Sequence, residues 1–219
     1  MIRSLLKREL LLCFFGYGTT SLGLAFFLSV IFISALGYEL TIANFSILGP
    51  GIIWTTTLLA VLITAEALIK DDYRDGSLDS FFMSPIPIEL ILITKALAHW
   101  ISVCCPIIII SPFIALIFDF SHLEILYLGL GLLLGTPAFS LIAMFGVSLT
   151  FSLKRAGILM PIISMPFYIP TLVFGLKIIS STKQDEVLAL EIIILGAITL
   201  ISTAIIPFAS SFGLKASIR

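Results

Sequence analysis

Charged residues are scarce in this chain of 219 residues, because Asp, Glu, Lys and Arg together make up only 11% of it. A soluble domain of this length carries about 25% charged residues, which it needs to cover its surface with polar groups. The scarcity therefore excludes a water-soluble fold. The net charge of −1 is also too small to provide the basic field that indicates nucleic-acid binding.

The residue types that build catalytic and metal sites are few as well. None of the three cysteines lies in a CxxC or CxxCH pattern, so the sequence predicts no redox pair, zinc site or covalently attached haem. Cys104 and Cys105 lie inside an apolar run and are interpreted as small core residues. Because no His, Glu and Asp residues cluster on segments that would face one another, we expect no catalytic residue and no metal site.

A phosphate-binding loop of the form GxxxxGK[ST] is absent. The nearest glycine cluster is Gly129, Gly131 and Gly135, which lies in an apolar segment with no lysine after it, so it cannot hold phosphates as a P-loop does. The spacing of Gly131 and Gly135 favours close helix packing in lipid instead. Any ATP that drives this protein must therefore be hydrolysed by another chain.

Long apolar blocks are what the sequence has in abundance. A helix needs about 20 apolar residues to cross the hydrocarbon core, and a backbone in lipid must satisfy its hydrogen bonds within such helices. Six blocks reach this length, which predicts an all-α integral membrane protein that forms one transmembrane domain over residues 1–219. The predicted spans cover residues 16–38, 47–69, 91–118, 123–151, 156–179 and 187–212.

The fifth predicted span contains three prolines, Pro161, Pro166 and Pro170. Each proline removes a backbone donor and clashes with the preceding turn, so we expect this helix to be kinked or broken. A membrane tolerates such irregularity where protein or a water-filled cavity covers the freed backbone groups. Pro166 and Pro170 are therefore candidates for a substrate or subunit interface.

Lysine and arginine lie mostly on one side of the predicted spans. Ten of the twelve cations share that side, whereas Lys177 and Lys183 lie on the other. The positive-inside rule then predicts that both termini are cytoplasmic. The ten cations predicted to be cytoplasmic are Arg3, Lys7, Arg8, Lys70, Arg74, Lys95, Lys154, Arg155, Lys215 and Arg219.

The first residues of the chain, Met1–Leu12, combine cations with apolar residues at helical spacing. This pattern predicts a short amphipathic helix that lies in the cytoplasmic interface before the first span. The alternative is a simple helical extension of that span. The apolar residues are Ile2, Leu5, Leu6, Leu10 and Leu12, and the cations are Arg3, Lys7 and Arg8.

The one sizeable polar stretch is Lys70–Glu89, which reads KDDYRDGSLDSFFMSPIPIE. Gly76 allows a turn. Ser77 is a good N-cap residue, and Asp79 in the following first turn complements the helix dipole. We therefore expect a short helix to begin at Ser77, in the connection between the second and third predicted spans.

The predicted helix, about residues 77–84, has one apolar face. Leu78, Phe81 and Phe82 fall at i, i+3 and i+4, and Pro85 then ends the helix, because the residue before a proline is pushed out of helical space. We interpret the helix as a coupling helix whose exposed aromatic face enters a groove of a cytoplasmic partner. Acidic residues around it suit a groove with a basic rim; the alternative is a helix that lies in the interface with its aromatic side chains in lipid.

Few polar groups lie within the predicted spans. Glu66 and Lys70 are spaced as an ion pair at a helix end, and Lys95 is expected to extend its ammonium group to the cytoplasmic surface. His99 is interpreted as a packed histidine, with a substrate contact as the alternative. No charge falls at the middle of the bilayer, which argues against an ion-coupled carrier. The candidates for a substrate or subunit interface are Glu66, His99, Trp100, Pro166 and Pro170.

Several motifs resemble a known family. The run DGSLDSFFMSP is similar to the signature that ABC-2-type permeases carry between their second and third spans. Six segments in order then resemble the haem exporter protein B family (CcmB), over nearly the whole chain. These segments are LGPGIIWTTTLLAVL at residues 48–62, KDDYRDGSLD at 70–79, TKALAHW at 94–100, LLLGTPAFS at 132–140, SLKRAGILMPI at 152–162 and PFASSFGLKASIR at 207–219.

The resemblance implies a permease subunit of the ABC transporter that serves cytochrome c maturation in the bacterial inner membrane. It implies a separate soluble ABC ATPase (CcmA) that docks on the connection helix, membrane subunits C and D, and a periplasmic haem chaperone E that is released at the expense of ATP. ATP would then bind to the ATPase, and haem would belong to the complex rather than to a site in this chain. The residues assigned to ATPase coupling are Asp71, Asp72, Arg74, Asp75, Gly76, Ser77, Leu78, Asp79, Phe81, Phe82 and Pro85.

Two interpretations of the chain's role are open at this level. In the first, two copies of the chain, or one copy with another membrane protein, form the pathway, because six spans are too few to enclose one. In the second, the chain is a membrane scaffold that holds a maturation complex together and passes no substrate.

Overall fold

The computed structural model describes residues 2–16, 18–37, 42–153, 155–183 and 189–217, and all regular structure within these ranges is helical. Six helical stretches are long and apolar enough to cross a membrane, so the prediction of an all-α protein with six spans is confirmed. The predicted span ends at Tyr38 and Val187 and the cations Lys154 and Arg219 lie outside the described residues. The six stretches are Thr19–Gly37, Ile47–Arg74, Ile88–Ile117, His122–Thr150, Ala156–Ser180 and Leu190–Ala216.

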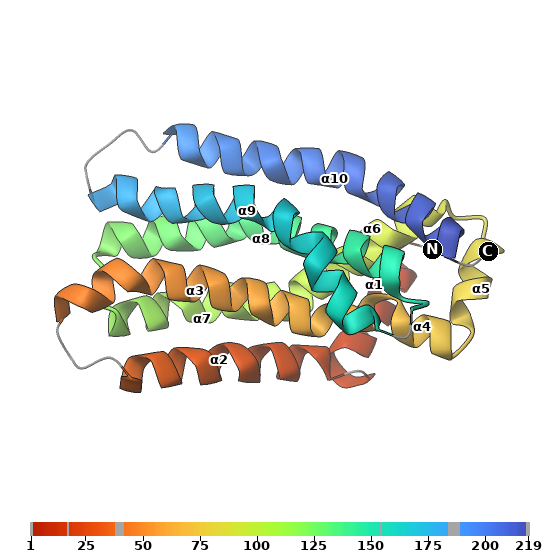
Figure 1. Cartoon of the computed structure of the whole chain (residues 1–219), viewed down its shortest axis with the longest axis horizontal. Helices are drawn as coiled ribbons and strands as arrows, with labels where there is room; N and C mark the ends of the chain where they lie inside the picture. The colour runs from red at the N-terminus through yellow and green to blue at the C-terminus, as the bar shows by residue number, and fades with distance from the viewer. Residues whose placement is uncertain (1, 17, 38–41, 154, 184–188, 218–219) are drawn as a thin grey trace.

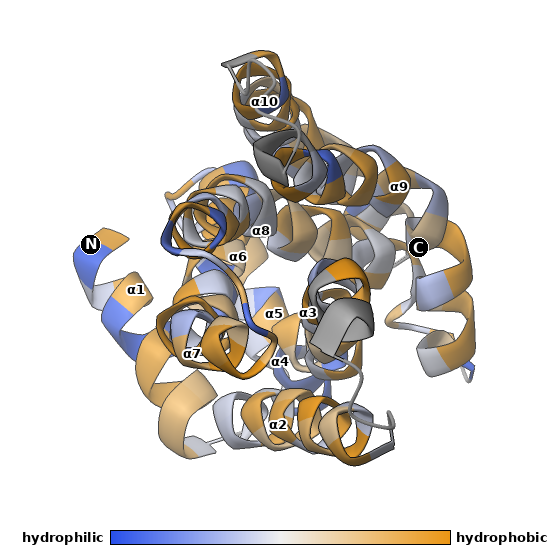
Figure 2. Cartoon of the chain, turned by 90° about the vertical axis from the view of Figure 1, so that its left-hand side faces the viewer, coloured by the Kyte–Doolittle hydropathy of each residue, from blue (hydrophilic) through white to orange (hydrophobic). Residues whose placement is uncertain are grey.

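The spans run side by side along the long axis of the molecule, with α8 at their centre (Figures 1 and 2). Helix α8 contacts α3, α6, α7, α9 and α10, whereas α2 lies at the edge of the bundle and packs chiefly on α3. The elements are α1 (Ile2–Leu11), η1 (Leu12–Gly16), α2 (Thr19–Gly37), α3 (Ile42–Thr64), η2 (Ala65–Leu68), α4 (Lys70–Arg74), α5 (Ser77–Phe82), α6 (Ile88–His99), η3 (Trp100–Cys104), α7 (Cys105–Ile117), α8 (His122–Thr150), α9 (Ala156–Lys183) and α10 (Ala189–Ser217).

Helix α1 is separate from the first span and lies across the spans rather than along them (Figure 2). A π-helical turn, η1, and Gly18 with φ +64° make the corner between α1 and α2; only glycine adopts this conformation without strain. The hydroxyl groups of Thr19 and Thr20 donate to the carbonyl oxygen of Cys13 at 2.9 and 3.2 Å and hold the corner. A short helix distinct from the first span is therefore confirmed, and the alternative of a simple extension of that span is wrong; its place in the membrane interface stays a prediction.

The third span contains a π-helical turn that the sequence analysis does not predict. It consists of α6, the π-helix η3 and α7, with Pro106 in the first turn of α7. Pro106 has no backbone N–H to donate to the preceding turn, and a π-turn is a common way for a helix to accommodate such a defect. The span stays continuous from Ile88 to Ile117.

Helix α9 is kinked but unbroken. Figure 1 shows its first half leaning away from the neighbouring helices, yet the helix continues from Ala156 to Lys183 through all three prolines. Pro166 and Pro170 are exposed on its outer face. Of the two expected outcomes, a kinked or a broken helix, the structure has the kink; the opposite face of α9 still packs on α8.

The middle of the bundle is built around Trp54, which is completely buried. Its indole ring lies against the bare backbones of Gly135 and Gly175, where an added Cβ would approach ring carbons to 2.9 and 2.4 Å. The ring of Phe139 meets Trp54 edge to face at a centroid distance of 6.0 Å, and Tyr168 meets Phe139 in the same way at 5.3 Å. The glycine spacing in α8 thus serves close packing, with the indole ring of α3 as the group that approaches.

We predict that Gly175→Ala destabilises the protein. The new methyl group would overlap the indole ring of Trp54, and overpacking of this kind costs about 1–3 kcal/mol. Gly196→Ala in α10 is the matched control, since no atom lies within 4 Å of the Cβ it would add. Denaturant unfolding in detergent measures both variants, and an equal response of the two would show that the indole does not need this space.

Candidate coupling site

The connection between the second and third spans folds into two short helices, α4 and α5, at the end of the bundle that also holds α1 and the last turns of α10 (Figure 1). We call this the terminal end. Gly76 joins the two helices with φ +77°, a left-handed conformation that favours glycine. Helix α5 ends at Phe82, two residues before the predicted end at residue 84.

Ser77 does not cap α5 as the sequence analysis expects, because Gly76 occupies the N-cap position. The Ser77 hydroxyl instead faces two carboxylates, at 2.9 Å from Oδ1 of Asp72 and in contact with Asp75. The backbone N–H of Ser77 also donates to Asp75 Oδ1 at 2.9 Å. These hydrogen bonds from Ser77 lower the pKa of Asp75, so the turn is stabilised by an ionised carboxylate rather than by a serine cap.

A buried ionic cluster lies behind α5. The ammonium group of Lys95 in α6 contacts the carboxylate of Asp72 in α4 and lies 2.8 Å from Oε2 of Glu9 in α1. Arg8 joins both carboxylates from the side, at 2.6 Å from Glu9 and 3.2 Å from Asp72. The side chains of Asp72, Lys95 and Glu9 are only 0%, 3% and 5% exposed, so these three groups are shielded from water, whereas Arg8 is 39% exposed at the edge of the cluster.

The cluster corrects two expectations from the sequence. Lys95 does not extend its ammonium group to the surface, because two buried carboxylates pair with it in the interior. Asp72 belongs to the interior for the same reason and is not available to a partner's groove. Charges this deeply buried are tolerated only when each one is paired, and here two cations face two carboxylates.

The inner face of α5 packs on the same cluster. Leu78 is 4% exposed, and the ring of Phe81 lies under both cations, with the Arg8 guanidinium carbon 5.7 Å and the Lys95 nitrogen 5.3 Å from its centroid. A cation over an aromatic face is attracted by the ring quadrupole. The expectation that Leu78 and Phe81 form an exposed face is therefore wrong; they anchor the helix to α1 and α6.

The outer face of α5 is formed by Asp79, Ser80, Phe82 and Met83, all of which are exposed. Phe82 is 38% and Met83 is 87% exposed, so two large apolar side chains stand at the terminal end beside an acidic one. Asp75, Gly76 and Pro85 are exposed around them. An apolar surface with charged neighbours is typical of a protein interaction site.

Glu66 and Lys70 form the expected ion pair. The side chain of Glu66 also reaches α9, because an added Cβ on Gly157 would lie 2.5 Å from Glu66 Oε1. Asp71 pairs with Arg74 at 3.8 Å on the surface of α4. The end of the second span is thus in contact with the start of the fifth.

His99 and Trp100 lie in the bundle interior, one turn further along the third span than Lys95. Nε2 of His99 is 2.9 Å from the Thr64 hydroxyl and Nδ1 is 3.1 Å from the Ser140 hydroxyl, while the indole N–H of Trp100 donates to Thr136 at 2.9 Å. Both ring nitrogens of His99 are therefore satisfied by α3 and α8. This geometry favours the packed histidine over a ligand that faces a substrate.

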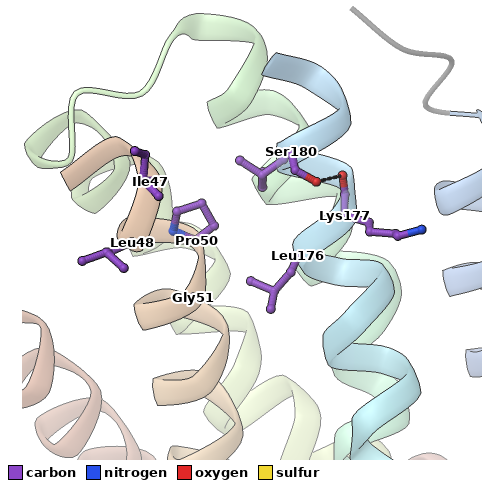
Figure 3. A pocket seen from close by; sticks show the side chains of 8 residues that line it. Ile47, Leu48, Pro50, Gly51, Leu176, Lys177 and Ser180 are labelled. Carbon is purple, nitrogen blue, oxygen red and sulfur yellow. Dashed lines mark hydrogen bonds between the residues drawn. The ribbon is translucent and has the colours of Figure 1, made fainter. Parts of the chain in front are cut away.

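An apolar groove of about 400 Å³ opens between α3 and α9 at the opposite end of the bundle (Figure 3). Figure 3 shows the ammonium group of Lys177 pointing away from it, and the Ser180 hydroxyl donates to the Lys177 carbonyl at 3.0 Å. The groove therefore offers a ligand mainly apolar contacts, and it is not part of the candidate coupling site. Its lining residues are Ile47, Leu48, Pro50, Gly51, Leu176, Lys177, Ile179 and Ser180.

Sequence reasoning missed Glu9 and the inward role of Arg8 and Lys95. One signal was available, because Glu9 is the first acidic residue of the chain and stands alone in a segment of cations and apolar residues. A lone carboxylate in an interfacial helix needs a cationic partner when it is buried. The identity of that partner depends on the tertiary structure.

We predict that Lys95→Met destabilises the protein by about 3–5 kcal/mol, because it leaves two buried carboxylates with only the partly exposed Arg8 as a cationic partner. Lys70→Met is the control, since its pair with Glu66 is partly exposed and such pairs contribute less than about 1 kcal/mol. Adding Asp72→Asn to Lys95→Met leaves Glu9 paired with Arg8, so that one cation again faces one carboxylate, and should restore part of the loss. Denaturant unfolding in detergent measures all three; equal losses at Lys95 and Lys70 would contradict the role of the cluster.

Comparison with known proteins finds similar sequences that match nearly the whole length of the chain. The family model described as "CcmB protein" matches residues 1–217. Proteins named heme exporter protein B are 36% identical in Rhodobacter capsulatus and 35% identical in Paracoccus denitrificans, each over 100% of both chains. The protein of that name in Pseudomonas aeruginosa is 35% identical over 98% of this chain and 96% of its own. The chain is a multi-pass membrane protein that belongs to the CcmB family.

Proposed function

We propose that this chain is the permease subunit of an ATP-driven haem exporter and that a separate ATPase docks on the outer face of α5. The relatives' name, heme exporter protein B, supports the substrate class. The absence of a phosphate loop from the sequence supports a separate ATPase. The terminal end is then cytoplasmic, in accordance with the positive-inside distribution of Lys and Arg.

The observation that carries this proposal is the ionic cluster behind α5. The outer face of α5 offers Phe82 and Met83 to a partner, while Phe81 on its inner face packs against Arg8 and Lys95. Because these contacts hold its inner face, α5 cannot rotate independently of the cluster when a force acts on its outer face. Movement of a docked ATPase is therefore transmitted to the elements that share the cluster.

Two spans receive this movement. Lys95 belongs to α6, the first part of the third span, and Asp72 belongs to α4, which continues the second span beyond η2. In the second span, Trp54 stands between α8 and α9. A shift along α3 would move this indole ring relative to the two helices, and the proline-kinked α9 lacks a backbone donor at three positions that would otherwise help to resist it.

The finer assignment is part of the same proposal. The exporter serves cytochrome c maturation in a bacterial inner membrane, with the soluble ABC ATPase (CcmA), membrane subunits C and D, and a periplasmic haem chaperone E. Two copies of this chain form the working unit, ATP binds to the ATPase, and haem is handled by the complex, whereas this chain by itself binds no cofactor and catalyses no reaction. The resemblance of the six sequence segments supports these partners.

We predict that the double variant Phe82→Asp/Met83→Asp lowers co-purification of the ATPase by more than about tenfold, because exposed apolar anchors dominate the energy of such contacts. Leu153→Asp is the matched control. Leu153 is 48% exposed in the connection between α8 and α9, which lies at the same end of the bundle (Figure 1). Phe81 is unsuitable for this test, because it packs inside and its loss would disturb the fold.

The measurement is pull-down of the ATPase by the tagged chain from solubilised membranes, with membrane insertion of each variant checked in parallel. Undiminished capture of the ATPase by a properly inserted double variant would reject α5 as the docking site. Loss of capture by Leu153→Asp to the same extent would show that added charge, and not the apolar anchors, causes the effect.

The scaffold alternative makes a different prediction for the assembled complex. If the chain transmits movement, an ATPase variant that binds ATP without hydrolysing it should stall release of the haem-loaded chaperone while the complex stays intact. A scaffold requires only assembly. Release at the wild-type rate from such an intact complex would therefore favour the scaffold.

A further inference from the structure

The outer face of α1 carries two cations that the ionic cluster does not use. Arg3 and Lys7 are exposed and lie four residues apart, so they share one side of the helix. Within the described part of the chain neither has a carboxylate partner, in contrast to Arg8 on the inner side, which pairs with Glu9 and Asp72. Arg3 and Lys7 are therefore available to an anion from outside the chain.

An apolar groove of about 470 Å³ lies between the start of α1 and the start of α6. Arg3 stands at its edge, and its walls are Ile2, Pro85, Ile86, Pro87 and Leu90. The ring of each proline fixes its φ angle, so this wall of the groove is already rigid before a ligand binds. The groove thus places a free cation beside a preformed apolar surface.

A second groove of about 280 Å³ follows the outer face of α1 itself. Two cations, Arg3 and Lys7, line it together with the apolar side chains of Leu6, Leu10, Leu11 and Phe14. Arg3 is common to both grooves. Each groove therefore combines positive charge with a lining that is otherwise apolar.

The position of α1 determines what can reach these grooves. Figure 2 shows α1 lying across the spans at the side of the bundle, as an amphipathic helix does in a membrane interface. In the orientation of the proposed function, Arg3 and Lys7 are level with the headgroups of the cytoplasmic leaflet. Anionic headgroups of this leaflet attract nearby Lys and Arg side chains.

We propose that the outer face of α1 and the start of α6 form a binding site for an anionic phospholipid. The lipid phosphate contacts Arg3 and Lys7, and an acyl chain occupies the groove beside Pro85 and Leu90. The apolar walls accept an acyl chain from any lipid, so the two cations alone confer the preference for an anionic headgroup. This inference rests on the proposed orientation of the chain and not on the transport of haem.

The bound lipid has a structural consequence. Glu9 lies on the inner side of the helix whose outer side holds the lipid, and it is buried where α1 packs on α6 and meets Lys95. An anchored α1 keeps water away from the ionic cluster. We therefore expect anionic lipid to stabilise the protein against heat more than zwitterionic lipid does.

The test is native mass spectrometry of the purified full-length chain in detergent with equimolar phosphatidylglycerol and phosphatidylcholine. We predict that phosphatidylglycerol is preferred and that Arg3→Gln and Lys7→Gln each reduce the preference about fivefold, as expected for one cation near an anionic headgroup. The matched control is Arg74→Gln, which removes an exposed cation at the same end that pairs with Asp71 and lines neither groove. Arg3→Lys/Lys7→Arg retains both charges and should keep the preference.

Leu90→Trp tests the groove without changing charge, and it should reduce the number of bound phosphatidylglycerol molecules. Equal binding of the two lipids by the wild-type chain would overturn the proposal, as would an unchanged preference in Arg3→Gln/Lys7→Gln. Loss of ATPase capture by this double variant with an unaltered lipid preference would also overturn it and would assign the surface to a protein. Failure of ATPase docking in the Phe82 and Met83 variant leaves the lipid measurement unaffected, so the two proposals are tested separately.

Discussion

Lys95 lies between the carboxylates of Glu9 and Asp72 and thereby joins three parts of the chain that are far apart in the sequence. Without this contact α6 would be connected to α1 and α4 at the terminal end chiefly by apolar packing, which resists sliding only weakly. The buried ion pairs fix the positions of these helices relative to one another, because moving any one partner away leaves an unpaired charge in a medium that solvates it poorly. The arrangement of α5 depends on this constraint.

The same constraint gives α5 two different sides. Leu78 and Phe81 are occupied by the cluster and the core, so they are unavailable to any partner. Phe82 and Met83 have no such role and remain exposed. A short helix of this kind would be marginal by itself, and its inner contacts are what allow it to present an apolar surface at a fixed angle.

The bundle beyond the terminal end is held together by a different type of contact. Trp54 fills the space between α3, α8 and α9 because the facing positions are glycine, and His99 joins α3 to α8 through two hydroxyl groups. Aromatic packing and neutral hydrogen bonds suit the hydrocarbon region, where an ion pair would be costly. Charge is therefore concentrated at the terminal end and shape complementarity in the middle.

The sequence by itself determined the class of protein, the number of spans and the family, because hydropathy over about 20 residues is a local property and the matching segments are contiguous. It also located the connection at residues 70–89 and the Glu66–Lys70 pair, whose members are one helical turn apart. Only the tertiary structure decided which side of α5 is exposed, that Ser77 serves carboxylates instead of a cap, and that Lys95 turns inward. Lys95 turns inward because Glu9, which lies 86 residues away, approaches it only in the folded chain, and no local pattern records a contact over that separation. The partners of Ser77 are close in the sequence, but which of them it meets depends on how the turn at Gly76 places α5 against α4.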